Sequence, residues 1–384
     1  AQAQESITTA TASRDNPMTA EAWDVNHPVL TLLRKRRQDG SMPGERTDNA
    51  KLGLAVEGGG MRGVVSASML TVLDDLGFSN AIDAVYAASS GAINCAYYMA
   101  GGTWYPLSIY FDDLNTQKFL NPRNIFTNKS VLNLDYAFDE VMQNIKPVDY
   151  EYILKSPIPL HIMITLVDEM ETLVTERLNS VEELREALRA SAWLPVALRG
   201  TTTYRGRRAI DGGVLTALPF RPAVDDGCTH VLLLTTHPMG SISGKMSMLN
   251  RYTEHHLNRI RPGLGARYLA ALRQKYADQR SLASMRFPDH ARNPYILDMA
   301  PLPGTIDVKR QELSTYKLFD AARSAYQVMY AALEGRQSST VRDGLVRAVP
   351  RFAIAEKDAQ DSRYIYLIDH SSKTNIPWSI ARRR

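Results

Sequence analysis

The stretch AVYAASSGAINCAYYMAGG occupies residues 84–102 and decides the fold. Its first residues are apolar and predict a buried strand, whereas residues 92–100 predict a buried helix that ends at two glycines. A strand that turns directly into a helix through small-x-Ser-x-Gly is typical of a nucleophile elbow. The strand and the helix pack closely there, so the residues two before and two after the serine must be small. The pattern predicts that the strained turn exposes the Ser89 hydroxyl, with Ala87 at the position where glycine is usual.

A second strand-turn-helix unit precedes this one. Residues 52–56 (LGLAV) predict an apolar strand, and residues 64–76 predict a helix from the spacing of their apolar side chains. The turn between them reads EGGGMRG, from Glu57 to Gly63. Three glycines at such a turn expose successive backbone N–H groups beside the positive end of a helix, which forms an anion site. We expect this site to hold a phosphate or the oxyanion of an acyl-transfer intermediate.

A third motif follows far along the chain, where an apolar run leads into Asp211–Gly213. Taken with Gly58–Gly63 and Ala87–Gly91, in this order, it resembles the three motifs of the patatin-like phospholipase family. The segment Ala190–Pro195 is similar to the small-residue, proline-containing segment that precedes the aspartate in that family. The resemblance covers roughly residues 50 to 240.

The resemblance implies a fold, an activity and a set of site residues. The fold is a three-layer α/β/α patatin-like fold with a mostly parallel central sheet, which also fits the alternation of predicted strands and helices. The activity is hydrolysis of lipid acyl esters by a Ser–Asp dyad, Ser89 and Asp211, without a cofactor. The amides of Gly59 and Gly60 would form the oxyanion hole, and Arg62 would orient this loop or meet a phosphate of the substrate.

The base that activates Ser89 has more than one candidate. A free aspartate is a weak base at pH 7, but partial desolvation raises its pKa and makes it a workable one. A histidine after Asp211 is the alternative, and His237 is the best placed because it follows a predicted buried strand. Ser90 is the fallback nucleophile.

Two other functions use the same residues. A transacylase would pass the acyl group to an alcohol or an amine in place of water. A lipid-binding or regulatory protein would have lost the activity, and Ala87 is the one feature that favours this interpretation.

Composition limits the remaining possibilities. With 384 residues, 44% of them hydrophobic, the chain can bury a large core, and a net charge of +4 does not indicate nucleic-acid binding. Cys95 and Cys228 are expected to be free thiols, and no Cys/His spacing indicates a metal site. No apolar run is long enough to span a membrane. We expect a cytoplasmic protein with at most peripheral membrane contact, and secretion stays an alternative.

The chain divides into four parts by pattern. Residues 1–50 predict a mobile arm to about residue 25, a short helix and a linker, and residues 51–240 predict the catalytic core. Residues 241–335 are expected to complete and cover the same domain with helices, and residues 336–384 form a polar C-terminal segment. The basic run at residues 34–37 is either a solvated helix end or a contact with phospholipid headgroups.

Overall fold

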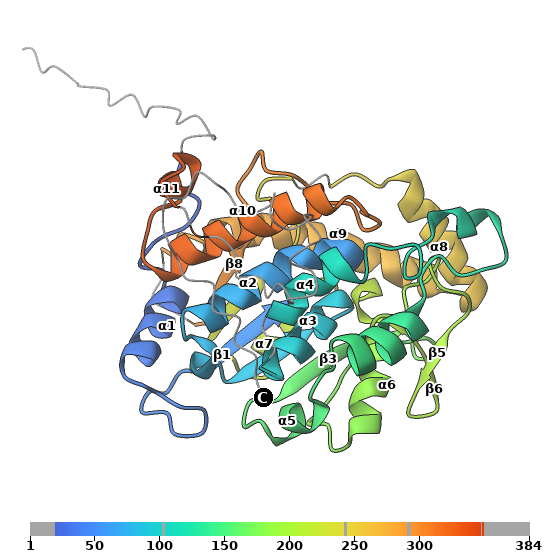
Figure 1. The fold of residues 1–384 in the computed structure, drawn as a ribbon, viewed down its shortest axis with the longest axis horizontal. Coiled ribbons are helices and arrows are strands. Elements are labelled where there is room, and N and C mark those ends of the chain that lie inside the picture. Colours follow the sequence, from blue (N-terminus) through green and yellow to red (C-terminus); the bar gives the residue numbers. More distant parts are fainter. Residues whose placement is uncertain (1–19, 102–103, 242–243, 290–292, 347, 349–384) are drawn as a thin grey trace, which may run out of the picture.

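The computed structural model describes residues 20–101, 104–241, 244–289, 293–346 and 348. They form a central eight-stranded sheet with helices on both faces (Figure 1). The strand order is β5-β6-β3-β2-β1-β7-β8, and β4 pairs with β3. The strands are β1 (Leu52–Val56), β2 (Ala84–Ala87), β3 (Leu160–Leu166), β4 (Glu171–Val174), β5 (Thr202–Tyr204), β6 (Arg207–Asp211), β7 (His230–Leu234) and β8 (Tyr295–Met299).

Five strands form parallel pairs, and the other three are joined to the sheet through antiparallel pairs. β3, β2, β1, β7 and β8 run in one direction, whereas β4 and β6 pair antiparallel with β3, and β5 pairs antiparallel with β6. All five residues of β1 are buried, as expected for a central strand of a parallel sheet with both faces covered. The side chains of Leu54 and Val56 enter the larger hydrophobic cluster, and that of Ala55 enters a second one on the opposite face.

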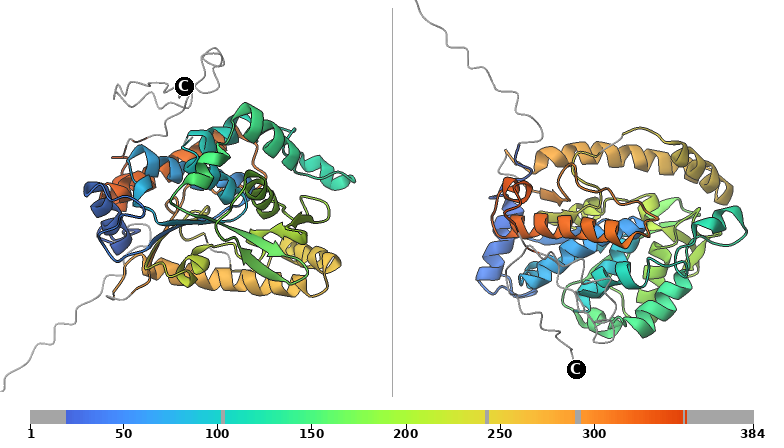
Figure 2. Two further views of the ribbon diagram at one scale, coloured as in Figure 1. Left: turned by 90° about the horizontal axis from the view of Figure 1, so that it is seen from below. Right: turned by 45° about the horizontal axis from the view of Figure 1, so that its top comes forward.

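The helices form two outer layers, one on each side of the sheet (Figure 2). One layer contains α2 (Gly63–Asp75), α3 (Ser90–Met99), α4 (Trp104–Asp112), α5 (Tyr150–Lys155), α6 (Val181–Ser191) and α10 (Thr315–Leu333). The other contains α7 (Phe220–Asp225) and α9 (Leu264–Met285), with α8 (Met248–Ile260) packed against α9. The remaining helices are α1 (Pro28–Gln38), α11 (Ser338–Arg342), the 3₁₀ turns η1 (Gly60–Arg62), η2 (Ser79–Ala81), η3 (Pro122–Phe126) and η5 (Gly212–Val214), and the π-helix η4 (Tyr136–Ile145).

This architecture confirms the predicted three-layer α/β class with a mostly parallel sheet. The strands predicted at residues 52–56 and 84–86 are present, and the helix predicted at 92–100 begins at Ser90. Helices were expected within residues 241–335, but α8 was not predicted individually, because its polar and basic residues lie next to a proline and two glycines. Ser247 caps α8 by accepting from the Asn250 amide. Among the described residues, no helix is both long enough and apolar enough to cross a bilayer.

The chain after residue 240 contributes to the same sheet and core. β8 pairs with β7, and α10 packs on α2. The arm predicted up to about residue 25 does not reach that far, because Trp23 is buried and the Ala22 amide donates to the Ser338 hydroxyl at 2.8 Å. The predictions for residues 1–19 and 349–384 lie outside the described residues.

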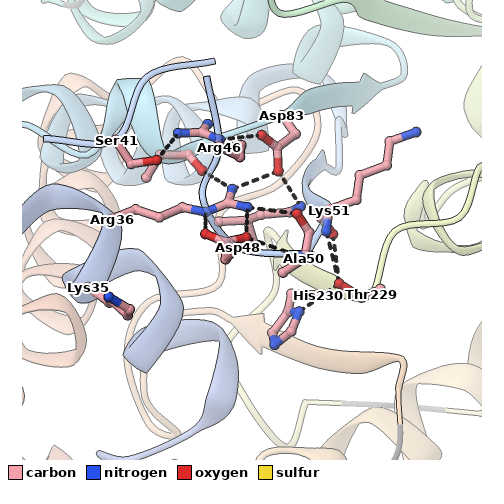
Figure 3. A network of polar contacts seen from close by, with 12 residues as sticks. Lys35, Arg36, Ser41, Arg46, Asp48, Ala50, Lys51, Asp83, Thr229 and His230 are labelled. Atoms are coloured by element: carbon pink, nitrogen blue, oxygen red, sulfur yellow. Dashed lines mark hydrogen bonds and ion pairs between the residues drawn. The ribbon is translucent and has the colours of Figure 1, made fainter. Parts of the chain in front are cut away.

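The basic run at residues 34–37 contains one buried cation, Arg36. Arg36 is 1% exposed and donates to both carboxylate oxygens of Asp48, to Asp83 at 2.6 Å, and to the carbonyls of Ala81 and Ala50 (Figure 3). Arg34 donates to the carbonyls of Leu333 and Val25. Lys35 pairs with Asp39, and Arg37 pairs with Glu334. Arg36 therefore joins α1 to the segments that precede β1 and β2, whereas Lys35 and Arg37 are exposed.

Candidate active site

Ser89 lies in a strained turn between β2 and α3. Its φ of 57° is in the left-handed region, which L-residues other than glycine rarely adopt. The surroundings leave no room for larger neighbours: a Cβ on Gly91 would stand 2.6 Å from the Val56 carbonyl oxygen, and one on Gly58 would stand 2.7 Å from the Ser89 Cβ. Ala87 is fully buried and pairs in register with Val56 and Ile162, so its methyl group fits the elbow.

The Ser89 hydroxyl donates a hydrogen bond of 2.6 Å to Oδ2 of Asp211. Asp211 is 2% exposed, and its other carboxylate oxygen accepts from the Gly213 amide at 2.7 Å. Burial raises the pKa of the Asp211 carboxyl to about 6, although the hydrogen bonds from Ser89 and Gly213 and the charge of Arg310 oppose this rise. The carboxylate is therefore oriented by the backbone and is more basic than a free aspartate.

Asp211 reaches Ser89 from an antiparallel strand. Asp211 is the last residue of β6, which pairs antiparallel with β5 and with β3. The length of β3 makes the second pairing possible. It pairs with β2 through Leu160–Ile162 and extends further through Ile164–Leu166, and β6 runs back along this extension to bring Asp211 opposite Ile164.

The segment Ala190–Pro195 connects the serine and the aspartate. The Ser191 hydroxyl accepts from the Ser89 amide at 2.9 Å and donates to the Met163 carbonyl at 2.7 Å. Two residues further on, the Trp193 carbonyl accepts from the Asp211 amide at 2.9 Å. The sequence analysis singled out this segment but gave no role to any residue in it. In the structure, Ser191 and Trp193 hold the backbone amides of Ser89 and Asp211.

The glycine loop lies beside the elbow. Gly59 and Gly60 have φ values of 137° and 61°, which explains glycine at both positions. The Met61 amide donates to the Arg310 carbonyl at 3.0 Å, and the Arg62 amide donates to the Gly59 carbonyl. Within the described part of the chain, the amides of Gly59 and Gly60 have no such acceptor.

Two arginines flank this loop. The Arg62 side chain folds over Gly59, where its Nε is buried without a hydrogen-bond partner among the described residues. Burial, together with the charge of Arg310, lowers the pKa of Arg62 to about 10. Arg310 is exposed, and its charge acts on Arg62, on Asp211 and on Tyr268. Nothing in the sequence pattern indicated Arg310, because it comes from a loop about 100 residues after the last motif.

A buried ion pair supports the start of the loop. The Glu57 carboxylate accepts from Lys275 Nζ at 2.7 Å and from the amide and hydroxyl of Thr236. Burial by itself would raise the pKa of Glu57, but the charge of Lys275 and these hydrogen bonds lower it to about 2. The Thr236 hydroxyl also contacts the Gly58 carbonyl at 3.2 Å. The loop is thereby fixed to α9 and to the end of β7.

The two alternative residues lie elsewhere. The Ser90 hydroxyl is buried against Gly63 at the start of α2. A Cβ added to Gly63 would stand 2.7 Å from this hydroxyl oxygen. His237 contacts Asp307 through Nδ1 at 3.1 Å. Among the described residues, no histidine forms a hydrogen bond with Ser89 or Asp211; His290 and His370 lie outside the described residues.

The fold and this geometry define an α/β protein with a serine elbow and a buried aspartate as its hydrogen-bond partner. Residues 54–224 match the family described as patatin-like phospholipase, which confirms the resemblance predicted from the motifs. The uncharacterized protein YjjU of Escherichia coli K12 is 21% identical over 191 residues, which cover 49% of this chain and 52% of YjjU. The chain thus spans about half the length of that relative. The crystal structure of VipD from Legionella pneumophila superposes with a TM-score of 0.44 at 12% identity, covering 76% of this chain and 68% of VipD.

Proposed function

We propose that this protein is a serine hydrolase that cleaves the acyl ester bonds of lipids. The observation that carries the proposal is the 2.6 Å hydrogen bond from the Ser89 hydroxyl to the buried Asp211 carboxylate. A serine is a poor nucleophile until a base takes its proton, and a carboxyl group with a pKa of about 6 is largely ionised at neutral pH and so available for this role. The match to patatin-like phospholipases over residues 54–224 supports lipid esters as the substrate class.

In the first half of the reaction Ser89 Oγ attacks the ester carbonyl carbon while Asp211 Oδ2 takes the hydroxyl proton. The amides of Gly59 and Gly60 are proposed to stabilise the oxyanion, and each such donor contributes on the order of 3 kcal/mol to the barrier reduction. Collapse of the intermediate breaks the ester C–O bond, and the proton on Asp211 passes to the departing alkoxide. The product of this half is an acyl-enzyme on Ser89.

In the second half a water molecule attacks the acyl-enzyme. Asp211 takes a proton from the water, the Ser89–acyl bond breaks, and the proton returns to Ser89 Oγ. The fatty acid leaves, and the hydrogen bond between Ser89 and Asp211 is restored. Arg62 is proposed to hold the glycine loop in place, because its side chain lies against Gly59.

A fluorophosphonate probe tests this proposal. It should label the wild-type protein and the Ser90→Ala variant, and it should not label Ser89→Ala. Hydrolysis of a soluble short-chain ester should show the same pattern. Unlabelled wild-type protein would refute the proposal in favour of a binding protein, and labelling of Ser89→Ala would show a different nucleophile.

A transacylase would form the same acyl-enzyme. Product analysis with and without an added alcohol distinguishes the two reactions, since a transacylase yields the transferred ester at the expense of the free acid. The inactive alternative had Ala87 in its favour. This argument is weakened by the structure, where the elbow geometry at Ser89 forms with alanine in that position.

A further inference from the structure

The two most exposed of the large apolar side chains lie in two separate segments. We define the η3 lip as residues 117–133 and the α8 lip as residues 244–267. The described part of the chain exposes eleven large apolar side chains, and five of them lie in these lips. Phe126 is 92% exposed and Met248 is 90% exposed, the highest values among the eleven; the other three are Ile125, Leu249 and Tyr252.

Both lips are strongly basic. The η3 lip contains three cations and no acidic residue, and the α8 lip contains five cations and Glu254 as its one acid. The two lips together have a formal charge of +7, whereas the whole chain has +4, so the rest of the chain sums to −3. The positive charge of the protein is thus concentrated around its exposed apolar tips.

The η3 lip is anchored beside the candidate active site. Arg199 donates to the Thr127 carbonyl through its guanidinium and to the Ser130 hydroxyl through its amide, and the Val131 amide donates to the Ala197 carbonyl at 2.7 Å. These anchors belong to the segment that begins with Trp193, whose carbonyl holds the Asp211 amide.

The α8 lip is anchored on the other side of Asp211. Leu257 and Leu264 are fully buried and share a hydrophobic cluster with Ile210 and Val214, which flank Asp211 in the sequence. The Asn250 side chain also accepts from the Tyr268 hydroxyl at 3.2 Å. The residues next to Asp211 thus form the floor to which this lip is attached.

The lips lie at one end of the molecule. Arg199, which anchors the η3 lip, is also close to His256 in the α8 lip. Burial and the charges of Arg259 and Arg199 lower the pKa of His256. The η3 segment and α8 occupy the end opposite α1 in every view (Figures 1 and 2). The basic run of α1 binds segments at the amino ends of β1 and β2, whereas Ser89 follows the carboxyl end of β2.

We propose that the η3 lip and the α8 lip dock the protein on an anionic lipid surface, with Phe126 and Met248 inserted among the headgroups. The cations around the tips match an anionic bilayer in charge, and the exposed apolar tips suit a lipid interface better than a highly charged polymer. This contact would bring the bilayer that supplies the substrate next to the segments that flank Asp211, on which both lips are anchored. The inference rests on the proposed function for its choice of lipid, and its test does not require turnover.

The test uses the full chain carrying Ser89→Ala, so that hydrolysis cannot change the vesicles. Co-sedimentation is measured with vesicles of phosphatidylcholine and with vesicles that also contain phosphatidylglycerol. Binding should favour the anionic vesicles and weaken as salt is raised, because surface charge attracts basic residues and salt screens that attraction. Replacing Arg251 and Lys129 by glutamine should weaken binding by about fivefold per cation.

A matched pair of variants locates the surface. Phe126→Ser/Met248→Ser should weaken binding to anionic vesicles by about tenfold or more. Phe287→Ser/Leu345→Ser removes two exposed apolar side chains that lie outside both lips, and it should leave binding unchanged. Unfolding temperatures of both variants confirm that each is folded.

Equal binding to the two kinds of vesicle, or equal loss in the two variant pairs, would overturn the docking surface. So would a wild-type dimer that the Phe126→Ser/Met248→Ser variant converts to a monomer without a loss of vesicle binding, since the lips would then join two copies of this chain. Absence of ester hydrolysis by the wild type would refute the proposed function and leave the vesicle result interpretable.

Discussion

The Ser89 hydroxyl and the Asp211 carboxylate are joined directly, at 2.6 Å, with no imidazole between them. Each partner is also held through its backbone, because the Ser89 amide binds the Ser191 hydroxyl and the Asp211 amide binds the Trp193 carbonyl. A base with a pKa of about 6 is about two units more basic than free aspartate, which makes direct proton transfer from serine less unfavourable. The higher basicity comes with a buried negative charge on Asp211.

The rate of ester hydrolysis should fall as Asp211 becomes protonated. Only the ionised carboxylate accepts the Ser89 proton, so kcat/KM should rise with an apparent pKa of about 6 and then level off toward pH 8. A soluble ester measured from pH 4.5 to 8.5 tests this. An inflection near pH 7 that disappears in His237→Ala would show that an imidazole is the base and would contradict the assignment of Asp211.

The Asp211→Asn variant should lose turnover and gain stability at neutral pH. The folded-state pKa of about 6 is above the ordinary value of 3.8, so the folded state binds this proton more tightly than the unfolded state does. Stability from this group is present below about pH 4 and is lost as pH rises toward 6. Removing the charge should therefore raise the free energy of unfolding at pH 7.5, by up to about 3 kcal/mol.

Urea unfolding of both proteins at pH 7.5 and pH 4 measures this difference. At pH 4 the gain should largely vanish, because the wild-type carboxyl is then protonated in the folded state. A variant that is less stable than the wild type at pH 7.5 would show that the hydrogen bonds to Asp211 outweigh its desolvation.

The local motifs predicted the site because their constraints are steric. Gly58, Gly91 and the residue at 87 must be small wherever a strand turns directly into a helix, so the sequence alone locates Ser89. The predicted partner Asp211 lies within hydrogen-bond distance of it. Each motif is a continuous run of a few residues, so it is recognisable in the sequence although Ser89 and Asp211 are 122 positions apart.

The features that were missed depend on distant contacts. Glu57 and Lys275 pair across 218 positions, and Arg310 reaches the glycine loop from the connection between β8 and α10. β6 pairs with the part of β3 that extends beyond β2, and no pattern in β6 itself reveals this partner. The helix α8 is stabilised by its contact with α9 rather than by a regular apolar stripe, since Leu257 is its one buried residue.

Ser191→Ala should lower kcat by about tenfold while the protein stays folded. The change removes the acceptor of the Ser89 amide and leaves the Met163 carbonyl without this donor, at a cost of about 1–3 kcal/mol in unfolding free energy. Ser68→Ala is the matched control, because Ser68 is equally buried and donates to the Ala322 carbonyl at 2.6 Å on the far side of α2. It should lose similar stability and keep its kcat; equal kcat values for the two variants would remove Ser191 from the site.

Ala87→Gly should leave kcat within about twofold of the wild type. The Ala87 methyl group already fits between Val56 and Ile162, so glycine relieves no clash at the elbow. Glycine within a strand lowers stability by about 0.5–1 kcal/mol through its greater freedom in the unfolded chain. Steady-state kinetics and urea unfolding test the two effects. A large increase in kcat would mean that the alanine distorts the turn.

Lys275→Met should destabilise the fold strongly, because it leaves the Glu57 carboxylate buried without its cation. Breaking a buried pair in this way costs about 3–5 kcal/mol. The pKa of Glu57 is about 2, below the ordinary value of 4.5, so its contribution to stability is present above pH 4.5 and is lost as pH falls toward 2. The loss in Lys275→Met should therefore be seen in urea unfolding at pH 7.

Two further variants separate charge from packing. The double variant Glu57→Gln/Lys275→Met should recover more than half of the lost stability, since no unpaired charge remains. The control Lys317→Met removes an exposed cation that lies 3.8 Å from Glu312, and it should change stability by less than about 1 kcal/mol. If Lys275→Met costs no more than Lys317→Met, the buried pair does not support the loop. Because Glu57 directly precedes Gly58–Gly60, loss of the pair should also lower kcat for soluble esters, and the double variant should keep part of that defect.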